Sequence, residues 1–381
     1  MTRSSAARTS GASRTADPAP TAAGRPPRHR ATRRVTAGPF AGRSTAVAAT
    51  LVAVLLAALV AACGSDPEPP PVATGDTEST ATTAAAAAPD GDEVGATPVA
   101  LPEAASTVEI VGTEYVFELD ATAADGAPID LDAGEALPAG WTHVEFHNEG
   151  DEAHQVMFAR LKDGVDLAEL ADTAGDDSSG SAAIEFVDML GGVSYIGPGQ
   201  SIEALVDLPA GMVLAMCYVP DAHGVAHALM GMTTTLTVEE AAAGADTGSP
   251  ADAEPVVGTI EMTADGYQVP DEVPPGWYRV VNLDEGEAGS AGTGLHELAV
   301  LGLDEPLAGD ELDQLLDDLA TNATPAVDLV AVGGMGALSA GFEGYLYLDL
   351  ESGPYLAVDF MPDPGEPRPH LLDGYVTAFE A

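Results

Sequence analysis

The residues best suited to chemistry lie in one segment in the middle of the chain. It reads CYVPDAHGVAHALMGM and runs from Cys217 to Met232. Within these sixteen letters stand one thiol, two imidazoles and two thioethers, from Cys217, His223, His227, Met230 and Met232. Such soft and borderline donors bind transition metals, whereas magnesium and calcium prefer oxygen. The segment is therefore the first candidate for a functional site.

Cys217 has no cysteine with which it could form an intramolecular disulfide. The other cysteine of the chain, Cys63, ends an N-terminal leader and has a different expected fate. In an oxidising compartment an unpaired thiol is open to oxidation unless something uses it. The pattern thus indicates a thiol with a function, although a buried free cysteine would give the same count.

The first 62 residues are typical of an export signal. They hold nine arginines and one acid, Asp17, and end in the apolar run 46–62, which is too short and alanine-rich for a membrane span. The run closes on VAACG, which resembles the lipobox of bacterial lipoproteins. That resemblance implies a signal peptide over 1–62, acylation of Cys63, the lipid bilayer as a partner and an extracytoplasmic, membrane-anchored protein. The alternative is an ordinary signal peptide with a chance cysteine.

The mature chain is strongly acidic. Once the leader is removed, four basic residues face sixty acidic ones. This charge excludes nucleic acid and anionic lipid surfaces as partners. A cationic protein partner remains open.

Two segments without large apolar residues divide the mature chain. They are residues 63–104, which we expect to be a disordered tether, and 239–254, which we expect to be a linker. The remaining parts, 105–238 and 255–381, each have the usual size of one domain.

These two parts repeat one another at a constant offset of 142 residues. The offset relates His154 to His296, the pair Gly191-Gly192 to Gly333-Gly334, and Val219-Pro220-Asp221 to Met361-Pro362-Asp363. Shared spacing over so many landmarks indicates an internal duplication.

Most of each copy has the pattern of β-strands. Short segments rich in β-branched and aromatic residues stand between Gly, Pro and Asp, at 142–147, 155–160, 202–208, 213–218 and 233–238. Acidic amphipathic stretches at 166–172 and 310–319 predict one short helix in each copy. The sequence therefore predicts an all-β protein made of two tandem Greek-key β-sandwich domains, each with a short helical insertion.

The segment from Cys217 resembles the copper loop of cupredoxins, in which a Cys ends one strand and a Met precedes the last one. The family's remaining ligand is a His after an Asn-containing turn, and the run from Asn148 to His154 fits that place. The resemblance implies a cupredoxin fold and one type 1 copper site in the first domain, with ligands His154, Cys217, His227 and Met232. The Cys-to-His spacing of ten residues is one longer than the family pattern, so His223 and Met230 stay open as alternatives.

The second copy lacks the thiol and the thioether. Its matching positions hold His296, Asp359, His370 and Tyr375, which excludes a type 1 copper site there. His296, Asp359 and His370 could instead hold a harder metal such as zinc, or be a structural remnant.

Two-domain copper enzymes need further histidines for a second copper centre. One normally stands directly before the Cys, where this chain has Met216, and another shortly after the first ligand, where it has Phe158 and Ala159. We therefore expect a protein that is not an enzyme, transfers single electrons to a redox partner or holds copper, and is tethered to the membrane. The alternative is a metal-free cupredoxin-like lipoprotein that serves as a binding or envelope module.

Overall fold

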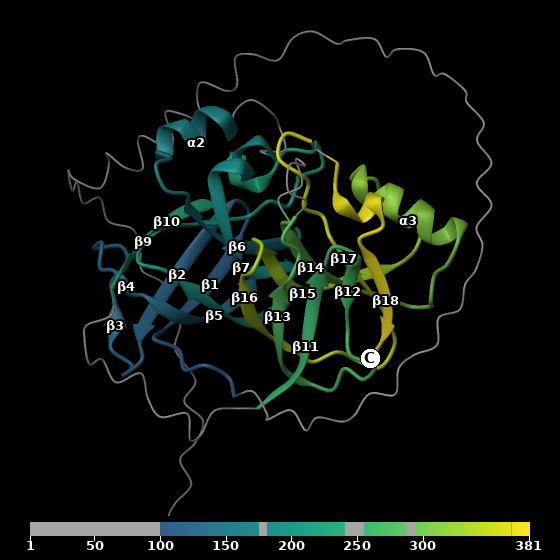
Figure 1. Ribbon diagram of the computed structural model, residues 1–381, viewed down its shortest axis with the longest axis horizontal. Helices are drawn as coiled ribbons and strands as arrows, with labels where there is room; N and C mark the ends of the chain where they lie inside the picture. Colours follow the sequence, from purple (N-terminus) through teal and green to yellow (C-terminus); the bar gives the residue numbers. More distant parts are fainter. Residues whose placement is uncertain (1–99, 175–180, 241–254, 287–293, 367) are drawn as a thin grey trace, which may run out of the picture. The chain divides into compact units, whose positions relative to one another are not determined.

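The computed structural model describes residues 100–174, 181–240, 255–286, 294–366 and 368–381 (Figure 1). The predicted signal peptide, Cys63 and nearly all of the predicted tether and linker lie outside these ranges. Among the described residues, no helix combines the length and the apolar character that a membrane crossing requires.

The strands of the described chain form two nine-stranded sheets. In spatial order the first contains β12 (Gly266–Gln268), β11 (Val256–Thr263), β13 (Gly276–Asn282), β16 (Glu343–Leu348), β8 (Ser201–Leu208), β5 (Gly140–Asn148), β1 (Ser106–Thr113), β2 (Val116–Ala123) and β3 (Pro128–Ile129). The second contains β18 (Val376–Glu380), β17 (Pro354–Val358), β14 (His296–Leu303), β15 (Leu329–Leu338), β7 (Val187–Ile196), β6 (His154–Leu161), β9 (Gly211–Met216), β10 (Thr233–Glu239) and β4 (Leu137–Pro138).

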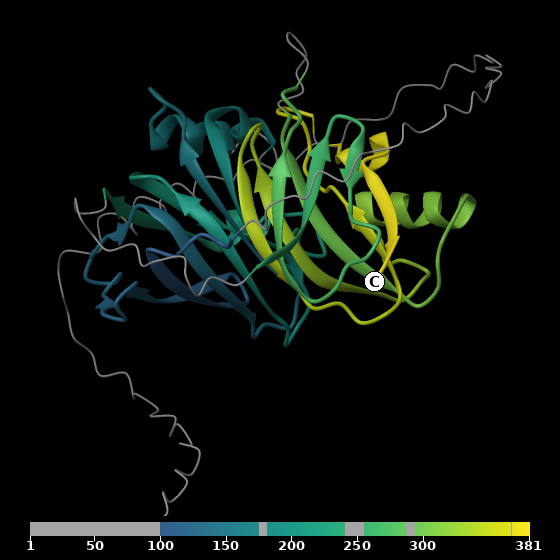
Figure 2. The same ribbon diagram turned by 60° about the horizontal axis from the view of Figure 1, so that its bottom comes forward.

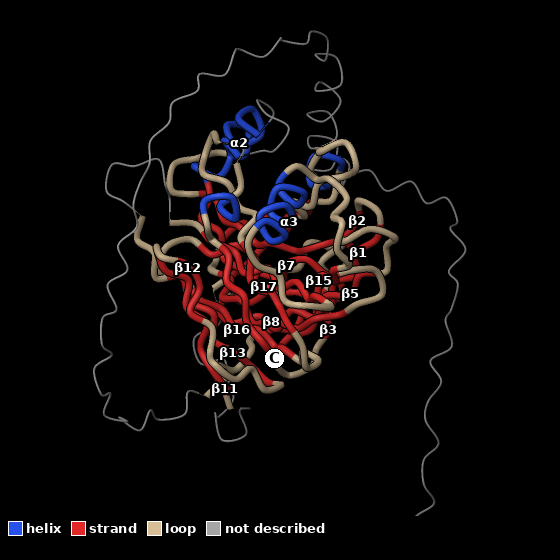
Figure 3. The backbone as a smooth tube through the Cα atoms, turned by 90° about the vertical axis from the view of Figure 1, so that its right-hand side faces the viewer, coloured by secondary structure: helices blue, strands red, loops and turns tan. Residues whose placement is uncertain are grey.

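Within the described ranges the helices are few and short. They are α2 (Leu167–Ala174), α3 (Asp310–Ala320) and the 3-10 turns η1 (Ser181–Phe186), η2 (His227–Met230) and η4 (His370–Asp373). Figure 3 shows them gathered on one side of the strands. The predicted all-β sandwich class with one helical insertion in each half is confirmed by these elements.

Burial along the strands explains where the helices lie. In β5, residues alternate between a buried face, which includes Val144 and Phe146, and a more exposed one, as expected for a sheet with one covered face. In β6 and β14 the first six residues are all buried. Their second face is covered because α2 and η1 pack over β6, and α3 packs over β14. Figure 2 shows α3 beside the strands of the second half.

Strand pairing joins the two repeated halves. Strand β8 pairs with β16 and β7 pairs with β15, both antiparallel, so each sheet contains strands from both halves (Figure 1). One apolar cluster accordingly includes residues of both, such as Ile202 and Met335. The domain boundaries at 105–238 and 255–381 stay a prediction.

A glycine marks the same irregularity in each half. Gly192 and Gly334 have φ of 126° and 138°, a region that side chains with a Cβ rarely adopt. A Cβ on Gly192 would lie 2.1 Å from the carbonyl oxygen of Val156, and one on Gly334 would lie 1.8 Å from that of Leu298. The strand registers shift at these places, between His154 and Val156 and between His296 and Leu298. The close approach thus lies immediately after the repeated histidine in both halves.

Candidate metal centre

An asparagine turn sets the position of His154, the first residue of β6. The amide of Asn148, at the end of β5, donates hydrogen bonds to the carbonyl oxygens of Glu152 (2.8 Å) and Ile196 (3.0 Å) and accepts one from the Gly150 N–H (2.9 Å). A Cβ on Gly150 would lie 2.7 Å from Nε2 of His154. The absence of a side chain there lets the turn pack directly against the imidazole.

Backbone hydrogen bonds within the loop itself position the other candidate ligands. Cys217 follows β9, and its N–H donates to the carbonyl of Met232 (3.1 Å). The N–H of His227 donates to Val219 (2.9 Å), and that of Met232 donates to His227 (2.9 Å). Asp221 stabilises the intervening turn by accepting from the N–H groups of His223 and Val225. The loop therefore holds its shape without help from a ligand.

Three donor atoms converge at this end of the first half. Sγ of Cys217 lies 3.6 Å from Nδ1 of His227, which lies 3.2 Å from Nδ1 of His154. All three side chains are fully buried, and the donors lie within 4.8 Å of one another. Metal–donor bonds of about 2.0–2.3 Å would place the donors of a trigonal site about 3.5–4.0 Å apart. The separations of Cys217 from His227 and of His227 from His154 lie within a few tenths of an ångström of these values, and Cys217 and His154 lie within 4.8 Å of each other.

Burial also sets the protonation of these groups. It raises the pKa of the Cys217 thiol to about 12, although N–H groups of Gln155 and Val219 that donate to the sulfur oppose this. Burial, together with the nearby His227, lowers the pKa of His154 to about 4. The pKa of His227 is lowered by burial, and the Glu152 carboxylate, 3.2 Å from Nε2, acts in the opposite direction. Both imidazoles are consequently neutral near pH 7, the form that can bind a metal.

The alternative ligands occupy different surroundings. His223 is exposed and Met230 is 39% exposed, whereas His227 and Met232 are fully buried. Met232 packs with Cys217 and Val219 in a small apolar cluster. The structure thus brings together His154, Cys217 and His227, with Met232 beside the thiol, and leaves His223 and Met230 outside. Metal binding by the four residues stays a prediction.

Carboxylates around the histidines are the residues that the sequence analysis did not name. Glu152 stands beside His227, and Asp284 beside His296 (3.0 Å). Asp284 stands two residues after Asn282, where the first half has Gly150 two residues after Asn148, so the repeat does not mark a carboxylate at this position. Nothing in the local pattern marks Glu152 among the sixty acids of the mature chain.

Comparison with known proteins bears on the fold alone. No protein-family model and no curated protein matches the chain. Among solved structures, auracyanin A, a "blue" copper protein from Chloroflexus aurantiacus, is 19% identical over 35% of this chain and 98% of its own, with a TM-score of 0.23. A blue copper oxidase from Nitrosomonas europaea is 14% identical over 72% of this chain and 84% of its own, with a TM-score of 0.18. A copper-containing nitrite reductase from Thermus scotoductus is 14% identical over 69% of this chain and 62% of its own, also with a TM-score of 0.18.

One prediction from the sequence is corrected by this comparison. We expected a protein that is not an enzyme, because Met216, Phe158 and Ala159 stand where two-domain copper enzymes have histidines. The neighbours in fold include an oxidase and a nitrite reductase, which are enzymes. The expectation is therefore withdrawn, and the likeness in fold assigns no reaction to this chain.

Proposed function

We propose that this protein is a type 1 copper protein that transfers single electrons outside the cytoplasmic membrane, to which a lipid on Cys63 anchors it. The observation that carries the copper assignment is the convergence of the Cys217 sulfur with Nδ1 of His154 and of His227 in a fully buried site. The anchor rests on the sequence around Cys63 alone.

The donor types favour copper over harder metals. One thiolate, two imidazoles and a weak thioether form a set that suits copper, and a copper ion held by it passes one electron with little change in geometry. His154 and His227 would supply the imidazoles, Cys217 the thiolate and Met232 the thioether. The N–H groups of Gln155 and Val219 would stabilise the negative charge on the sulfur, as they already point at it.

The surroundings of the site favour electron transfer over exchange of ligands with solvent. All four residues are fully buried, so bulk water does not reach the donor atoms. The loop is closed by its own backbone bonds, which limits the rearrangement that a change of oxidation state would cause. A redox partner would have to approach from outside this loop, and the tether over 63–104 would let the domain reach a partner in the membrane.

The copper assignment is tested by titrating the purified mature protein with one equivalent of copper(II). We expect strong visible absorption from the thiolate–copper bond. Cys217→Ser should abolish it while leaving the circular dichroism spectrum unchanged. No absorption in the wild type, or equal absorption in the variant, would leave the metal-free binding module as the better account.

The anchor is tested separately by Cys63→Ala. We expect the wild type in the membrane fraction and the variant in the soluble extracytoplasmic fraction, because one cysteine carries the lipid. A variant that stays with the membrane would contradict the lipoprotein assignment without affecting the copper site.

A further inference from the structure

The second half contains its own convergence of buried donor atoms. Oδ2 of Asp359 lies 2.7 Å from Nδ1 of His296 and 3.0 Å from Nδ1 of His370. Asp359 is fully buried, and the side chains of the two histidines are 7% and 12% exposed. Two imidazole nitrogens and a carboxylate oxygen thus meet at one point, with little access for water.

The two histidines keep the arrangement of the first half. The ring centroids of His296 and His370 lie 5.2 Å apart with an interplanar angle of 61°, and those of His154 and His227 lie 5.1 Å apart at 59°. Only the third donor differs, since Asp359 stands where the first half has Cys217. A pair of imidazoles with unchanged geometry is what a retained metal site would require.

A second layer of carboxylates lies behind both rings. Nε2 of His296 is 3.0 Å from Oδ2 of Asp284, and Nε2 of His370 is 3.6 Å from Oδ1 of Asp363. A carboxylate on this side favours the tautomer that carries its proton on Nε2, which leaves the lone pair of Nδ1 directed at the site. Histidines that bind metals are commonly supported in this way.

Three carboxylates surround this site, and a bound cation would offset their negative charge. In the described part of the chain, the carboxylates of Asp284, Asp359 and Asp363 form ion pairs with His296 and His370 only, and no lysine or arginine pairs with them. Protons on both imidazoles would add two positive charges, and one divalent cation would add the same number.

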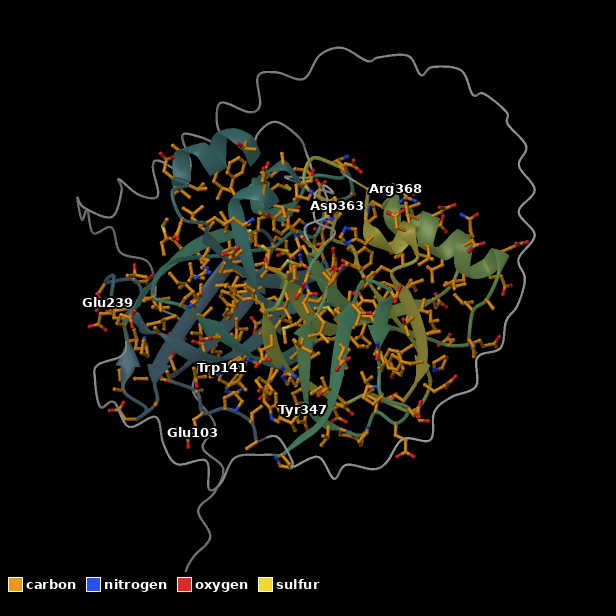
Figure 4. The ribbon with its side chains drawn as sticks, in the orientation of Figure 1. Glu103, Trp141, Glu239, Tyr347, Asp363 and Arg368 are labelled. Atoms are coloured by element: carbon orange, nitrogen blue, oxygen red, sulfur yellow. The ribbon has the colours of Figure 1, made fainter. Side chains whose placement is uncertain are left out.

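We propose that His296, His370 and Asp359 form a second metal site, which binds one divalent cation of the zinc type. Two imidazoles and one carboxylate are a common protein ligand set for zinc, and they lack the thiolate that copper prefers in the first half. Tetrahedral bonds of about 2.1 Å would separate the donors by about 3.4 Å, so Oδ2 of Asp359 would move less than about 1 Å away from each imidazole nitrogen on binding. Asp363, labelled in Figure 4, lies at the opposite end of the strands from Trp141 and Tyr347.

The test isolates the second site in the full chain. The background is Cys217→Ser with His227→Gln, which removes two of the three donors of the first half. Calorimetric titration with zinc chloride should show one equivalent bound with a Kd of about 1 µM or lower. This readout does not depend on copper, so it stands apart from the visible absorption that tests the proposed function.

Matched variants in this background identify the ligands. Asp359→Asn keeps the shape of the side chain but removes its charge. We expect Asp359→Asn and His370→Gln, each as a single change, to weaken zinc binding at least about tenfold. Asp284→Asn removes the carboxylate behind His296 and should weaken zinc binding by about ten- to a hundredfold. Asp373→Asn, an exposed carboxylate paired with Arg368, should leave binding unchanged.

Two results would overturn the proposal. The first is that the folded background protein binds no zinc. The second is that Asp359→Asn binds as much zinc as the background protein, which would mean adventitious binding by surface acids. If the background protein does not fold, as judged by circular dichroism, total zinc stoichiometry in the wild type and in Asp359→Asn decides instead. The variant should hold one zinc fewer, and equal stoichiometry would overturn the proposal.

Discussion

Cys217 and Asp359 occupy the same place in the two halves and receive the same pair of backbone hydrogen bonds. N–H groups of Gln155 and Val219 donate to the Cys217 sulfur. N–H groups of Glu297 (3.4 Å) and Met361 (2.8 Å) donate to Oδ1 of Asp359. Both positions therefore direct two backbone N–H groups at a buried side chain next to two histidines, and they differ in whether sulfur or oxygen accepts them.

This equivalence predicts that Asp359→Cys creates a second thiolate site. In a Cys217→Ser background we expect the double variant to regain about one equivalent of visible thiolate–copper absorption, because His296 and His370 keep the ring geometry of the first half. The measurement is a copper(II) titration followed by absorption.

The control for that titration is Asp363→Cys, whose side chain is 32% exposed and lies on the outer side of His370. It should give no comparable band. Absence of the band in a folded Asp359→Cys protein would show that the two positions are not equivalent.

The two candidate histidines of the loop should behave differently. His227→Gln removes a fully buried donor 3.6 Å from the sulfur, and we expect it to weaken copper binding at least about tenfold and to alter the visible spectrum. His223→Gln changes an exposed side chain and should leave both unchanged. The comparison is made by competitive titration against a chelator, and equal effects of the two substitutions would argue against His227 as a ligand.

The metal-free protein should lose stability in acid partly through His154. Because the pKa of His154 is lowered by burial from 6.5 to about 4, the unfolded chain takes up a proton between these pH values that the folded chain does not. The free energy of unfolding should therefore fall as the pH falls from about 6.5 to 4, and His154→Gln should reduce that dependence by up to one proton.

Urea denaturation at several pH values, with a chelator present, measures this slope. His147→Gln serves as the control, because its partly exposed ring bonds Ser201 on the outer face of β5. Identical slopes in wild type and His154→Gln would contradict the assignment of a neutral, buried His154.

Gly192 should tolerate no side chain. Gly192→Ala would place Cβ 2.1 Å from the Val156 carbonyl oxygen at a φ of 126°, and we expect it to lower the free energy of unfolding by more than about 3 kcal/mol. Gly353→Ala, where nothing lies within 4 Å, should change it by less than about 1 kcal/mol. Chemical denaturation compares the two, and a mild effect at Gly192 would mean that the strand can shift to make room.

The sequence alone indicates the types of candidate metal ligands, the pattern of the strands and the internal repeat. The donor types around Cys217 limit which metals can bind, because the softness of a ligand belongs to the side chain itself. Alternating apolar residues predict strands such as β5, and the constant offset of 142 residues reveals the duplication. These features depend on side-chain type, on neighbours along the chain or on the spacing between residues, so they can be found without the tertiary structure.

Convergence and strand partners were decided only by the tertiary structure. His154 and His227 are 73 residues apart, and the choice between His227 and His223 depends on how the loop turns around Asp221. Distances between such residues result from the packing of the whole chain, because many alternative arrangements share the same local pattern. The same holds for Asp284 beside His296 and for the pairing of β7 with β15, which no periodicity along the sequence encodes.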